Sequence, residues 1–597
     1  MTDYTPPLAD MRFVLHEMIG LERITALPGC EQVGQELVDA ILDEAGKFAR
    51  DVLAPLNRVG DTEGSRLVDD VVRTPTGFCD AYQQFIAGGW SALTGDPEHG
   101  GQGLPAIVSA AVQEMWNAAN MGFALCPLLT VGAIEALSYT GTEAQKSLYL
   151  DKLIDGTWTG TMNLTEPQAG SDLAAVRTRA VPDGDRYRLH GQKIYITYGD
   201  HDYTANIIHL VLARLPDAPE GVKGISLFLV PKFLVNADGS LGARNDVRCV
   251  SLENKLGIHA SPTAVMAYGD TQGAVGYLLG EANRGLEYMF IMMNQERFGV
   301  GIQGIAISER AYQQALDYAR TRVQGTEVGV RGGPRVPILR HPDVRRMLLS
   351  MKAETEAMRA VAYVAAAAMD VGRLHPDAVA RADAQAMADL LIPVVKGWST
   401  ETSLGVTSTG IQVHGGMGFI EETGAAQHAR DARILTIYEG TTAIQANDLV
   451  GRKIARDGGA AARVAIAEMR ATLATLEGAE LAPLRVALTD AVALLERAVA
   501  WVVETSGTQP REVAAGAVPF LKLFGVVAGG WQMGRAAHIA QTRLAAGDNS
   551  DPGFYRAKLA TARFYADHVL PQAHGLAHAA MHGASSVLAP DDVLFAA

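Results

Sequence analysis

The 597-residue sequence has few cysteines, no long apolar run and a deficit of positive charge. Its four cysteines, Cys30, Cys79, Cys126 and Cys249, lie far apart without a Cys-x-x-Cys pair, which argues against a disulfide framework or a metal site. No stretch is continuously apolar over the roughly 18 residues of a membrane span, so no integral membrane segment is expected. A net charge of −15 without long Lys or Arg runs disfavours nucleic acid as a partner.

The N-terminus reads MTDYTPPLADMRFVLHE, with acidic residues early and no basic segment before an apolar one. This pattern does not match a signal peptide, so we expect a cytoplasmic enzyme. The chain is too long for a single hydrophobic core, and about two to four domains are expected.

Hydrophobic periodicity divides the chain. Apolar residues recur three and four apart before and after a central region in which the period changes to two. No helical pattern separates the central strands at 187–199, 207–215 and 224–233, and no Rossmann fingerprint is present, so an antiparallel barrel or sandwich is expected. The tail predicts helices at 460–477, 480–505, 511–546 and 552–582. The predicted segments are an N-terminal helical extension (1–32), a helical domain (33–158), a β-domain (159–279), a helical bundle (280–456) and an extra C-terminal helical domain (457–597).

The stretch from His428 to Val450 begins and ends with helical pattern but is interrupted at Tyr438-Glu439-Gly440-Thr441-Thr442. A Glu beside a Gly is a poor helix interior, yet it can direct a carboxylate into a pocket. From these residues alone, an ordinary helix–turn–helix joint with a solvated Glu439 is the more common arrangement.

Two further stretches could bind a polar ligand. In the loop Asn163–Asp172, Thr165 and Ser171 offer hydroxyls, although a plain turn between a helix and a strand is equally typical. In Lys193–Thr197, strand alternation places Tyr195 and Thr197 on one face and the two isoleucines on the other. A ring beside a hydroxyl suits a flat heteroaromatic ligand, but both residue types are also common in strands.

Together these stretches resemble the acyl-CoA dehydrogenase family. LTEPQAGSD is similar to the family's LTEPxxGSD flavin loop, and KIYIT to its KxWIT strand, with Tyr195 in place of Trp. YARTR, QVHGGMGF and IYEGTTAIQ are similar to its YAxxR, QxxGGxGF and YEGTxxIQ motifs, and the five occur in family order. The resemblance implies a mainly helical subunit with a β middle domain, a C-terminal four-helix bundle and bound FAD, to which the tail adds a further helical domain.

The resemblance also implies the site residues. Those expected at the subunit's own FAD are Met162, Leu164, Thr165, Ser171, Tyr195, Thr197, Thr441 and Ala443, and those expected at a neighbouring subunit's FAD are Arg322, His341, Gln412, Gly415 and Gly416. Those expected at CoA are Ser171, Asn294, Arg297 and Gly440. Three places depart from the family pattern: Tyr195 replaces Trp, Asn294 replaces Asp, and Val323-Gln324-Gly325 lacks the usual aromatic residue. No metal is expected.

The implied reaction is α,β-desaturation of an acyl-CoA thioester, with Glu439 removing the α-proton while the β-hydrogen leaves as hydride to flavin N5. An α C–H is far too weak an acid for a Glu with a pKa of about 4.3, so burial must raise the base's pKa and hydrogen bonds must stabilise the enolate. Glu296 occupies the position from which some family members supply the base. Those members generally lack the Glu of YEGT, so Glu439 is favoured; Glu296 could instead pair with Arg297 or a helix neighbour.

Partners and alternatives follow from the same resemblance. Electron-transfer flavoprotein is the expected electron acceptor, a homodimer or homotetramer the expected assembly, and fatty acid β-oxidation the expected process. The chain ends resemble a long bacterial subgroup that includes members acting on 3-methylmercaptopropionyl-CoA, which is the alternative substrate. Two other classes stay open: an acyl-CoA oxidase or nitroalkane oxidase-like flavoprotein, and a non-catalytic helical assembly protein.

Overall fold

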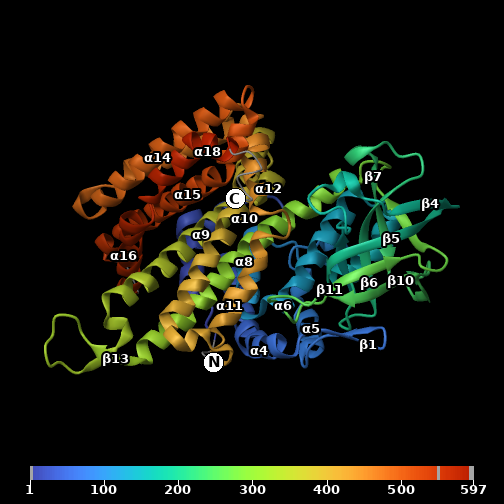
Figure 1. Cartoon of the computed structure of the whole chain (residues 1–597), viewed down its shortest axis with the longest axis horizontal. Helices are drawn as coiled ribbons and strands as arrows, with labels where there is room; N and C mark the ends of the chain where they lie inside the picture. The colour runs from blue at the N-terminus through green and yellow to red at the C-terminus, as the bar shows by residue number, and fades with distance from the viewer. Residues whose placement is uncertain (1–3, 548–550, 590–597) are drawn as a thin grey trace. The chain divides into compact units, whose positions relative to one another are not determined.

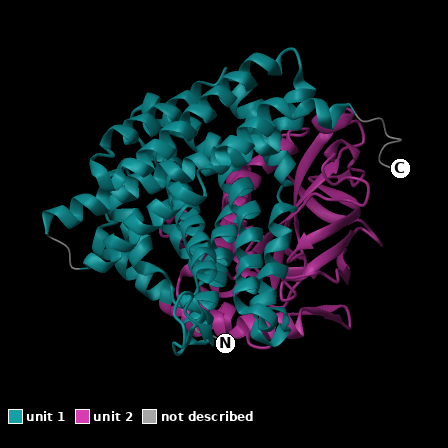
Figure 2. Cartoon of the chain, turned by 60° about the vertical axis from the view of Figure 1, so that its left-hand side comes forward, with its two compact units in different colours: residues 1–46, 105–118, 300–597 teal, residues 47–104, 119–299 magenta. Residues whose placement is uncertain are grey.

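The computed structural model describes residues 4–547 and 551–589. The chain forms two compact units, drawn in two colours in Figure 2. Neither unit is continuous in sequence, because the chain passes between them more than once. Unit 1 comprises Met1–Gly46, Pro105–Ala118 and Val300–Ala597, and unit 2 comprises Lys47–Leu104 and Ala119–Gly299. The division of the sequence into five successive domains remains a prediction.

Unit 2 contains the β-structure that the two-residue period predicts. Its main strands are β3 (Trp158–Asn163), β4 (Arg179–Asp183), β5 (Arg186–Thr197), β6 (Asn206–Arg214), β7 (Ile225–Pro231), β10 (Val247–Leu252), β11 (Thr263–Tyr268) and β12 (Ala274–Leu279). Five of them close into a ring in the order β5, β12, β7, β6 and β4. Figure 1 labels β4, β5, β6 and β7 among the strands of this unit. Closure leaves fewer unpaired edges. The hydrophobic core of this β-structure includes Leu189, Val211, Phe228 and Tyr268.

One feature of this sheet departs from the antiparallel expectation. Strand β3 pairs parallel with β6, from Trp158 opposite Asn206 to Asn163 opposite Val211, and the single β4–β6 bridge is parallel as well. Parallel neighbours need a long crossover connection. Here the crossover contains β4 and β5 instead of a helix, so the sequence showed no helical pattern that would have indicated it.

Unit 2 also contains short helices and two hairpins. Helix α7 (Glu143–Ile154) begins with a capping box, in which Thr142 and Gln145 satisfy each other's backbone N–H groups. The remaining elements are η2 (Ala49–Leu53), α4 (Ala54–Glu63), α5 (Phe78–Ala87), η3 (Trp90–Ala92), η4 (Pro97–His99), η5 (Leu173–Ala175), η6 (Gly221–Gly224), and the hairpins β1 (Arg66–Val68) with β2 (Val71–Arg73) and β8 (Phe233–Val235) with β9 (Leu241–Arg244).

Helices α6 (Ala106–Thr140) and α8 (Gly285–Thr321) each contribute residues to both units. Helix α6 is interrupted at Asn120, whose φ of −158° and ψ of 90° are not helical. The Asn120 side chain accepts a 3.1 Å hydrogen bond from Phe123 N and donates one of 3.3 Å to Leu53 O. It thereby satisfies backbone groups near the break, as Asn does in turns.

The bundle of unit 1 contains α9 (Pro342–Leu374), α10 (Ala378–His414), α11 (Ala425–Ala432) and α12 (Thr442–Asn447). Long runs of α9 and α10 are buried on several faces, as is typical of helices inside a bundle. The connecting elements are α3 (Gln35–Phe48), the hairpin β13 (Val323–Thr326) with β14 (Arg335–Pro337), η7 (Ile338–Arg340), η8 (Gly415–Phe419), η9 (Glu421–Thr423), η10 (Arg433–Thr436) and the π-helix η11 (Asp448–Ala455).

The N-terminal extension is helical, as predicted, but its helical structure is irregular. Its helices are α1 (Leu8–Arg12), the π-helix η1 (Phe13–Ile19) and α2 (Leu21–Thr25). Gly20, with a φ of 75°, separates the last two. Five of the seven residues of η1 are buried, so this helix is covered on more than one of its faces.

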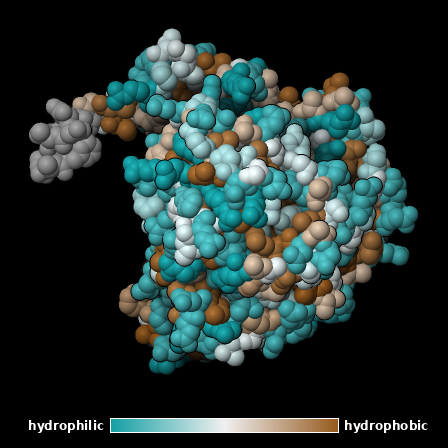
Figure 3. All heavy atoms as spheres, turned by 90° about the vertical axis from the view of Figure 1, so that its right-hand side faces the viewer, coloured by the Kyte–Doolittle hydropathy of each residue, from teal (hydrophilic) through white to brown (hydrophobic). Residues whose placement is uncertain are grey.

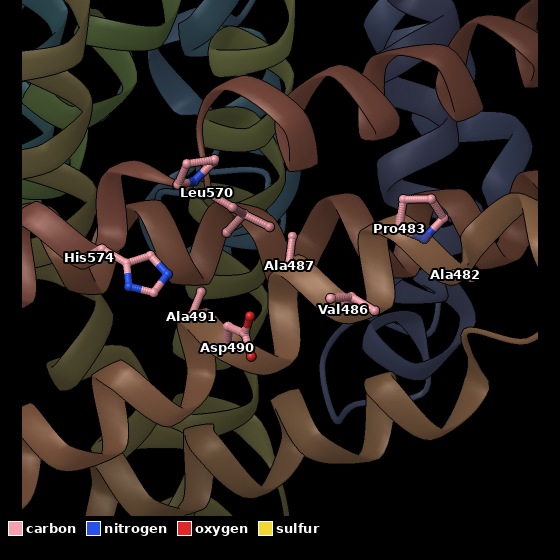
Figure 4. Close-up of a pocket in the computed structure, with 9 residues that line it drawn as sticks. Ala482, Pro483, Val486, Ala487, Asp490, Ala491, Leu570 and His574 are labelled. Carbon is pink, nitrogen blue, oxygen red and sulfur yellow. The ribbon is translucent and has the colours of Figure 1, made fainter.

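The tail forms six helices in its described part: α13 (Ala460–Thr475), α14 (Gly478–Ser506), α15 (Pro510–Ala546), α16 (Pro552–His568), α17 (Gln572–His582) and α18 (Ala584–Leu588). The predicted helix 552–582 is therefore wrong as a single element. It divides at 569–571, where Pro571 lacks the N–H that a continuing helix would need. A cavity of about 590 Å³ lies between α14 and the α16–α17 connection, lined mainly by apolar residues together with Asp490 and His574 (Figure 4).

Among the residues that the structure describes, two helices, α6 and α15, are long and apolar enough to cross a membrane by length and composition. The apolar windows of α6 and α15 are 83% and 72% buried inside the protein, which is typical of core helices. The surface drawn in Figure 3 mixes hydrophilic and hydrophobic residues.

Candidate active site

The helical run that begins at α11 is broken where the sequence predicts. Helix α11 ends at Ala432, η10 ends at Thr436, and α12 begins at Thr442. In the intervening turn, Glu439 and Gly440 have φ values of 53° and 86°. The left-handed region costs a non-glycine residue roughly 1–2 kcal/mol. A non-glycine residue held there by its surroundings is typical of functional sites.

Three side chains of unit 1 hold this turn in place. Lys396 Nζ, which is fully buried on α10, donates a 2.7 Å hydrogen bond to Gly440 O. Gln445 Nε2 donates to Glu439 O at 3.1 Å, and Tyr438 donates its hydroxyl hydrogen to Gln303. The carbonyls of Glu439 and Gly440 are thus fixed from the protein side, and Glu439 is half-buried. That its carboxylate faces a substrate remains a prediction.

The residues after the turn are arranged as a helix start. Thr441 Oγ1 accepts a 3.3 Å hydrogen bond from Ile444 N as the N-cap of α12. Its O–H hydrogen is not used by that bond. Thr441 is half-buried and Ala443 is exposed, and whether either contacts FAD remains a prediction.

In unit 2, the predicted flavin loop is built around a buried ion pair that sequence reasoning missed. Glu166 Oε1 lies 2.8 Å from Lys193 Nζ of β5. Lys193 also donates to Leu164 O at 3.0 Å, while Thr178 donates to Glu166 Oε1 from its hydroxyl at 2.6 Å and Arg177 N donates to Oε2 at 2.7 Å. This buried carboxylate therefore joins both ends of the loop to the strand.

The two partners titrate away from their usual ranges. Burial alone would raise the pKa of Glu166, but the charge and hydrogen bond of Lys193 and the Thr178 and Arg177 donors lower that pKa to about 2. Burial lowers the pKa of Lys193 to about 8, partly opposed by Glu166. Both groups are therefore charged at neutral pH. In the sequence, this ion pair could have been suspected only from a Glu within LTEPQAGSD and a Lys within KIYIT, because the other residues of these motifs are mostly apolar or turn-forming.

The predicted flavin-contacting residues of β5 lie beside that loop. Ile194 N donates a 2.9 Å hydrogen bond to Thr165 O, and the β5–β11 register shifts at the next residue. Tyr195 at this bulge has a φ of 61° and is 61% exposed. Thr197 is half-buried and Ile196 is in the core. The predicted alternation holds from Tyr195 to Thr197, whereas Ile194 is only half-buried because the bulge disturbs the period.

These residues fit a flavin. An exposed aromatic ring held by a strained bulge lies next to a loop whose Thr165 is half-buried, and hydroxyl and backbone groups are the donors that a heteroaromatic ring system needs. Ser171 is exposed. Met162 and Leu164 are buried, so these two residues could offer only backbone groups to the flavin. Their individual roles remain predictions.

The competitor for the base role lies in unit 2. Glu296 of α8 is completely buried, and its Oε1 lies 3.0 Å from where a Cβ on Gly132 would be. Arg297 is 4% exposed with its guanidinium 5.8 Å from the Phe290 ring centre, and Asn294 is exposed. Glu296 and Arg297 therefore lie inside the protein and not on a solvent-facing side of α8.

The residues predicted to reach a neighbouring subunit's FAD gather in unit 1. The rings of Tyr318 and His414 stack with centres 4.5 Å apart, which brings the YARTR segment beside the QVHGG segment. Arg322, Gln412, Gly415 and Gly416 are all exposed. His341 is half-buried, and its Nε2 lies 2.7 Å from Gln324 O, so that nitrogen already has a partner within the chain.

Comparison with known proteins covers nearly the whole sequence. Four family models match: the acyl-CoA dehydrogenase N-terminal domain (residues 35–157), middle domain (161–270) and C-terminal domain (283–454), and the acetyl-CoA dehydrogenase C-terminal-like model (465–591).

Individual relatives match over similar lengths. The 3-methylmercaptopropionyl-CoA dehydrogenase of Ruegeria pomeroyi is 52% identical over 95% of this chain and 96% of its own. A butyryl-CoA dehydrogenase of Syntrophomonas wolfei is 35% identical over 96% of both chains. The structure of an acyl-CoA dehydrogenase of Bacillus anthracis complexed with FAD superposes with a TM-score of 0.72 at 21% identity, covering 96% of this chain and 92% of that one.

Proposed function

Because this chain belongs to the acyl-CoA dehydrogenase family and is an FAD-dependent oxidoreductase acting on a CH–CH bond, we propose that Glu439 is the base that removes the substrate's α-proton. The observation that carries this assignment is the left-handed Glu439-Gly440 turn, whose two carbonyls are held by Gln445 and Lys396. A base must be positioned before its pKa matters, and these hydrogen bonds fix the backbone from which the carboxylate extends.

The chemistry divides between the chain and its cofactor. Bound FAD supplies the acceptor for the β-hydrogen, which leaves as hydride. Glu439 takes the α-proton, so the C–H electron pair becomes the new C=C bond. Thr165, Tyr195 and Thr197 would hold and shield the flavin ring, with Met162, Leu164 and Ser171 beside them. Asn294, Arg297, Ser171 and Gly440 would contact the CoA substrate.

The carboxylate must become a stronger base than it is in water. Glu439 is half-buried before any substrate binds, and an apolar acyl chain that covers it would remove more of its solvent. Desolvation disfavours the charged form of a carboxylate and raises its pKa. The pKa of the carboxyl thus comes closer to the pKa of the α C–H. Hydrogen bonds to the thioester carbonyl stabilise the enolate and reduce this pKa difference further.

For the substrate we propose a short acyl-CoA, with 3-methylmercaptopropionyl-CoA as the specific candidate. The support is the 52% identity to a protein of that name along almost the full chain, against 35% to a butyryl-CoA dehydrogenase. The matched comparison is pentanoyl-CoA, which has a methylene where the thioether has sulfur. Steady-state kcat/KM with a dye acceptor should favour the thioether over pentanoyl-CoA; equal values would leave a general short-chain enzyme of fatty acid β-oxidation.

We propose that the enzyme works as a homodimer or homotetramer in the cytoplasm and passes electrons to an electron-transfer flavoprotein. The exposed Arg322, Gln412, Gly415 and Gly416 support the assembly, because they offer a guanidinium, an amide and open backbone to another copy. A Cβ on either glycine would meet nothing within 4 Å.

The base assignment is tested by two isosteric variants. Glu439→Gln should retain FAD, seen by its absorbance near about 450 nm, and should lose about 10³-fold or more in the rate of flavin reduction by acyl-CoA. Glu296→Gln should retain most of that rate. Full reduction in the first variant together with loss in the second would move the base to Glu296.

A further inference from the structure

The C-terminal tail contacts the helix that holds the Glu439 turn. Lys522 of α15 lies with its Nζ 2.9 Å from Glu401 Oε2 of α10. The other oxygen of that carboxylate, Oε1, accepts a 2.7 Å hydrogen bond from Thr442 Oγ1. Thr442 is the first residue of α12 and follows the turn directly. One carboxylate therefore connects the tail to the end of the turn.

An apolar contact also connects α15 with α12, through Gly397 of α10. A Cβ on Gly397 of α10 would lie 2.4 Å from Leu521 Cδ2 and 3.3 Å from Gln445 Cβ, so α15 and α12 both press against this glycine. Gln445 in turn donates to the carbonyl of Glu439. Leu521 is completely buried, and its neighbour in sequence makes the ionic contact with Glu401.

The polar link is electrostatically favourable. Burial would raise the pKa of Glu401, but hydrogen bonds from Lys522 and Thr442 lower that pKa below its usual value. Side chains of Glu401 and Lys522 are 23% and 38% exposed. Solvent therefore screens the pair only in part, and the Thr442 hydroxyl keeps the carboxylate oriented.

We propose that Lys522 is a positioning residue for catalysis: by holding Glu401 on Thr442, the tail helix α15 fixes the start of α12 and with it the Glu439 turn. The inference rests on the proposed role of Glu439. The tail would then contribute to the reaction, in addition to forming its own hydrophobic core. In this proposal the effect of Lys522 passes through Glu401 and Thr442.

The test compares charge removal with charge retention in the holoenzyme. Lys522→Met keeps an unbranched side chain without charge, and Lys522→Arg keeps the charge. Arg470→Met is the control, because Arg470 makes an exposed ion pair with Glu496 inside the tail. Hydrogen exchange is followed for the peptide covering 434–450 without substrate, and flavin reduction is followed at saturating acyl-CoA.

Lys522→Met should speed exchange at the amides of 442–447 by about fivefold and slow flavin reduction by about as much, with the acyl-CoA dissociation constant unchanged. Lys522→Arg should restore both, and Arg470→Met should change neither. Should Lys522→Met lower only the melting temperature, or Lys522→Arg fail to restore the exchange rate, the tail is a structural cap and the proposal is wrong.

Glu401→Gln provides the second variant if Lys522→Met does not fold. Its amide oxygen can still accept from Thr442, but it carries no charge for Lys522, so exchange and reduction should change as in Lys522→Met. Normal exchange in this variant would also overturn the proposal. The exchange measurement does not depend on which residue is the base, so it separates this proposal from the Glu439 assignment.

Discussion

Lys193 Nζ lies 2.8 Å from Glu166 Oε1, and both side chains are almost completely shielded from solvent. The two residues are 27 positions apart and belong to the two motifs that are expected to contact the flavin ring. Breaking a buried pair by removing one partner costs more than the pair contributes, because the remaining charge stays buried. The pair therefore fixes the loop against the strand.

The first prediction concerns this pair. Glu166→Gln should destabilise the protein by about 3–5 kcal/mol and lower its FAD content, because Lys193 is left as a buried ammonium. Glu166→Gln with Lys193→Met should recover much of the loss, since no charge remains. Urea unfolding and the ratio of flavin to protein absorbance measure both. An additive double variant would show that the two residues act independently.

The same pair has a pH signature in the wild-type protein. The pKa of Glu166 is lowered to about 2 in the folded state, below the roughly 4.3 of an unfolded Glu. Its contribution to stability is fully present above the unfolded value and is lost as pH falls from there towards 2. Glu166→Gln should flatten the pH dependence of the unfolding free energy in that window, and an unchanged slope would contradict the assignment.

The second prediction concerns Tyr195, whose φ of 61° is rare for a residue with a side chain. Tyr195→Ala and Tyr195→Gly both delete the ring, but only glycine occupies the left-handed region without strain. The glycine variant should be more stable than the alanine variant by about 1 kcal/mol. Both should bind FAD equally weakly, and Tyr195→Trp should bind it as wild type does. Chemical denaturation and flavin titration test the two effects separately.

Periodicity and motif order were enough to predict the three-part fold and the break that carries Glu439. The reason is local: strands and helices differ in apolar period, and an isolated Glu-Gly pair interrupts a helix. The pairing of strands and the packing of helices are not determined by neighbouring residues in the sequence. The bulge at Tyr195, the parallel β3–β6 pair and the division of 552–582 depend on which distant segment each strand or helix meets.

The supporting side chains of the site were also beyond sequence reasoning. Lys396 stands in the apolar run DLLIPVVKGW, where a lysine is unusual, yet nothing nearby indicates that it bonds Gly440. Lys522 and Glu401 are separated by more than a hundred residues. Their partnership exists only because α15 packs against α10, and close packing at Gly397 cannot be inferred from one sequence.

The third prediction concerns a buried ionic cluster in unit 1. Arg359 is 1% exposed and binds Glu114 at 2.6 Å, Asp10 at 2.5 Å and Glu309 at 2.7 Å. Lys558 of the tail also contacts Asp10. The cluster joins the N-terminal extension, the bundle and the tail through side chains that are at most 11% exposed.

Arg359→Met should destabilise the protein by about 3–5 kcal/mol, because several carboxylates lose their shared cation. Burial already raises the pKa of Glu114, and Arg359 is the cation that opposes this rise, so without the guanidinium the folded protein would bind more protons near neutral pH than the unfolded chain. The loss should therefore be larger at pH 8 than at pH 5.5. Arg563→Met, which breaks an exposed pair with Asp567, should cost less than about 1 kcal/mol at either pH. Thermal unfolding at the two pH values measures these differences.

The last prediction tests whether Arg322 serves a neighbouring subunit. Arg322→Ala removes the exposed guanidinium, and Glu439→Gln removes the base, so each variant alone should be nearly inactive. In a mixed dimer, the Arg322→Ala subunit keeps its own Glu439 and receives Arg322 from its partner, which makes one complete site.

Equal co-expression should then produce about a quarter of wild-type activity, because half of randomly paired dimers are mixed and each has one complete site of two. If Arg322 served the FAD of its own subunit, no pairing would create a complete site, and the mixture would stay as inactive as its components. A dimer of dimers gives the same fraction, so the readout does not depend on whether the enzyme is a dimer or a tetramer.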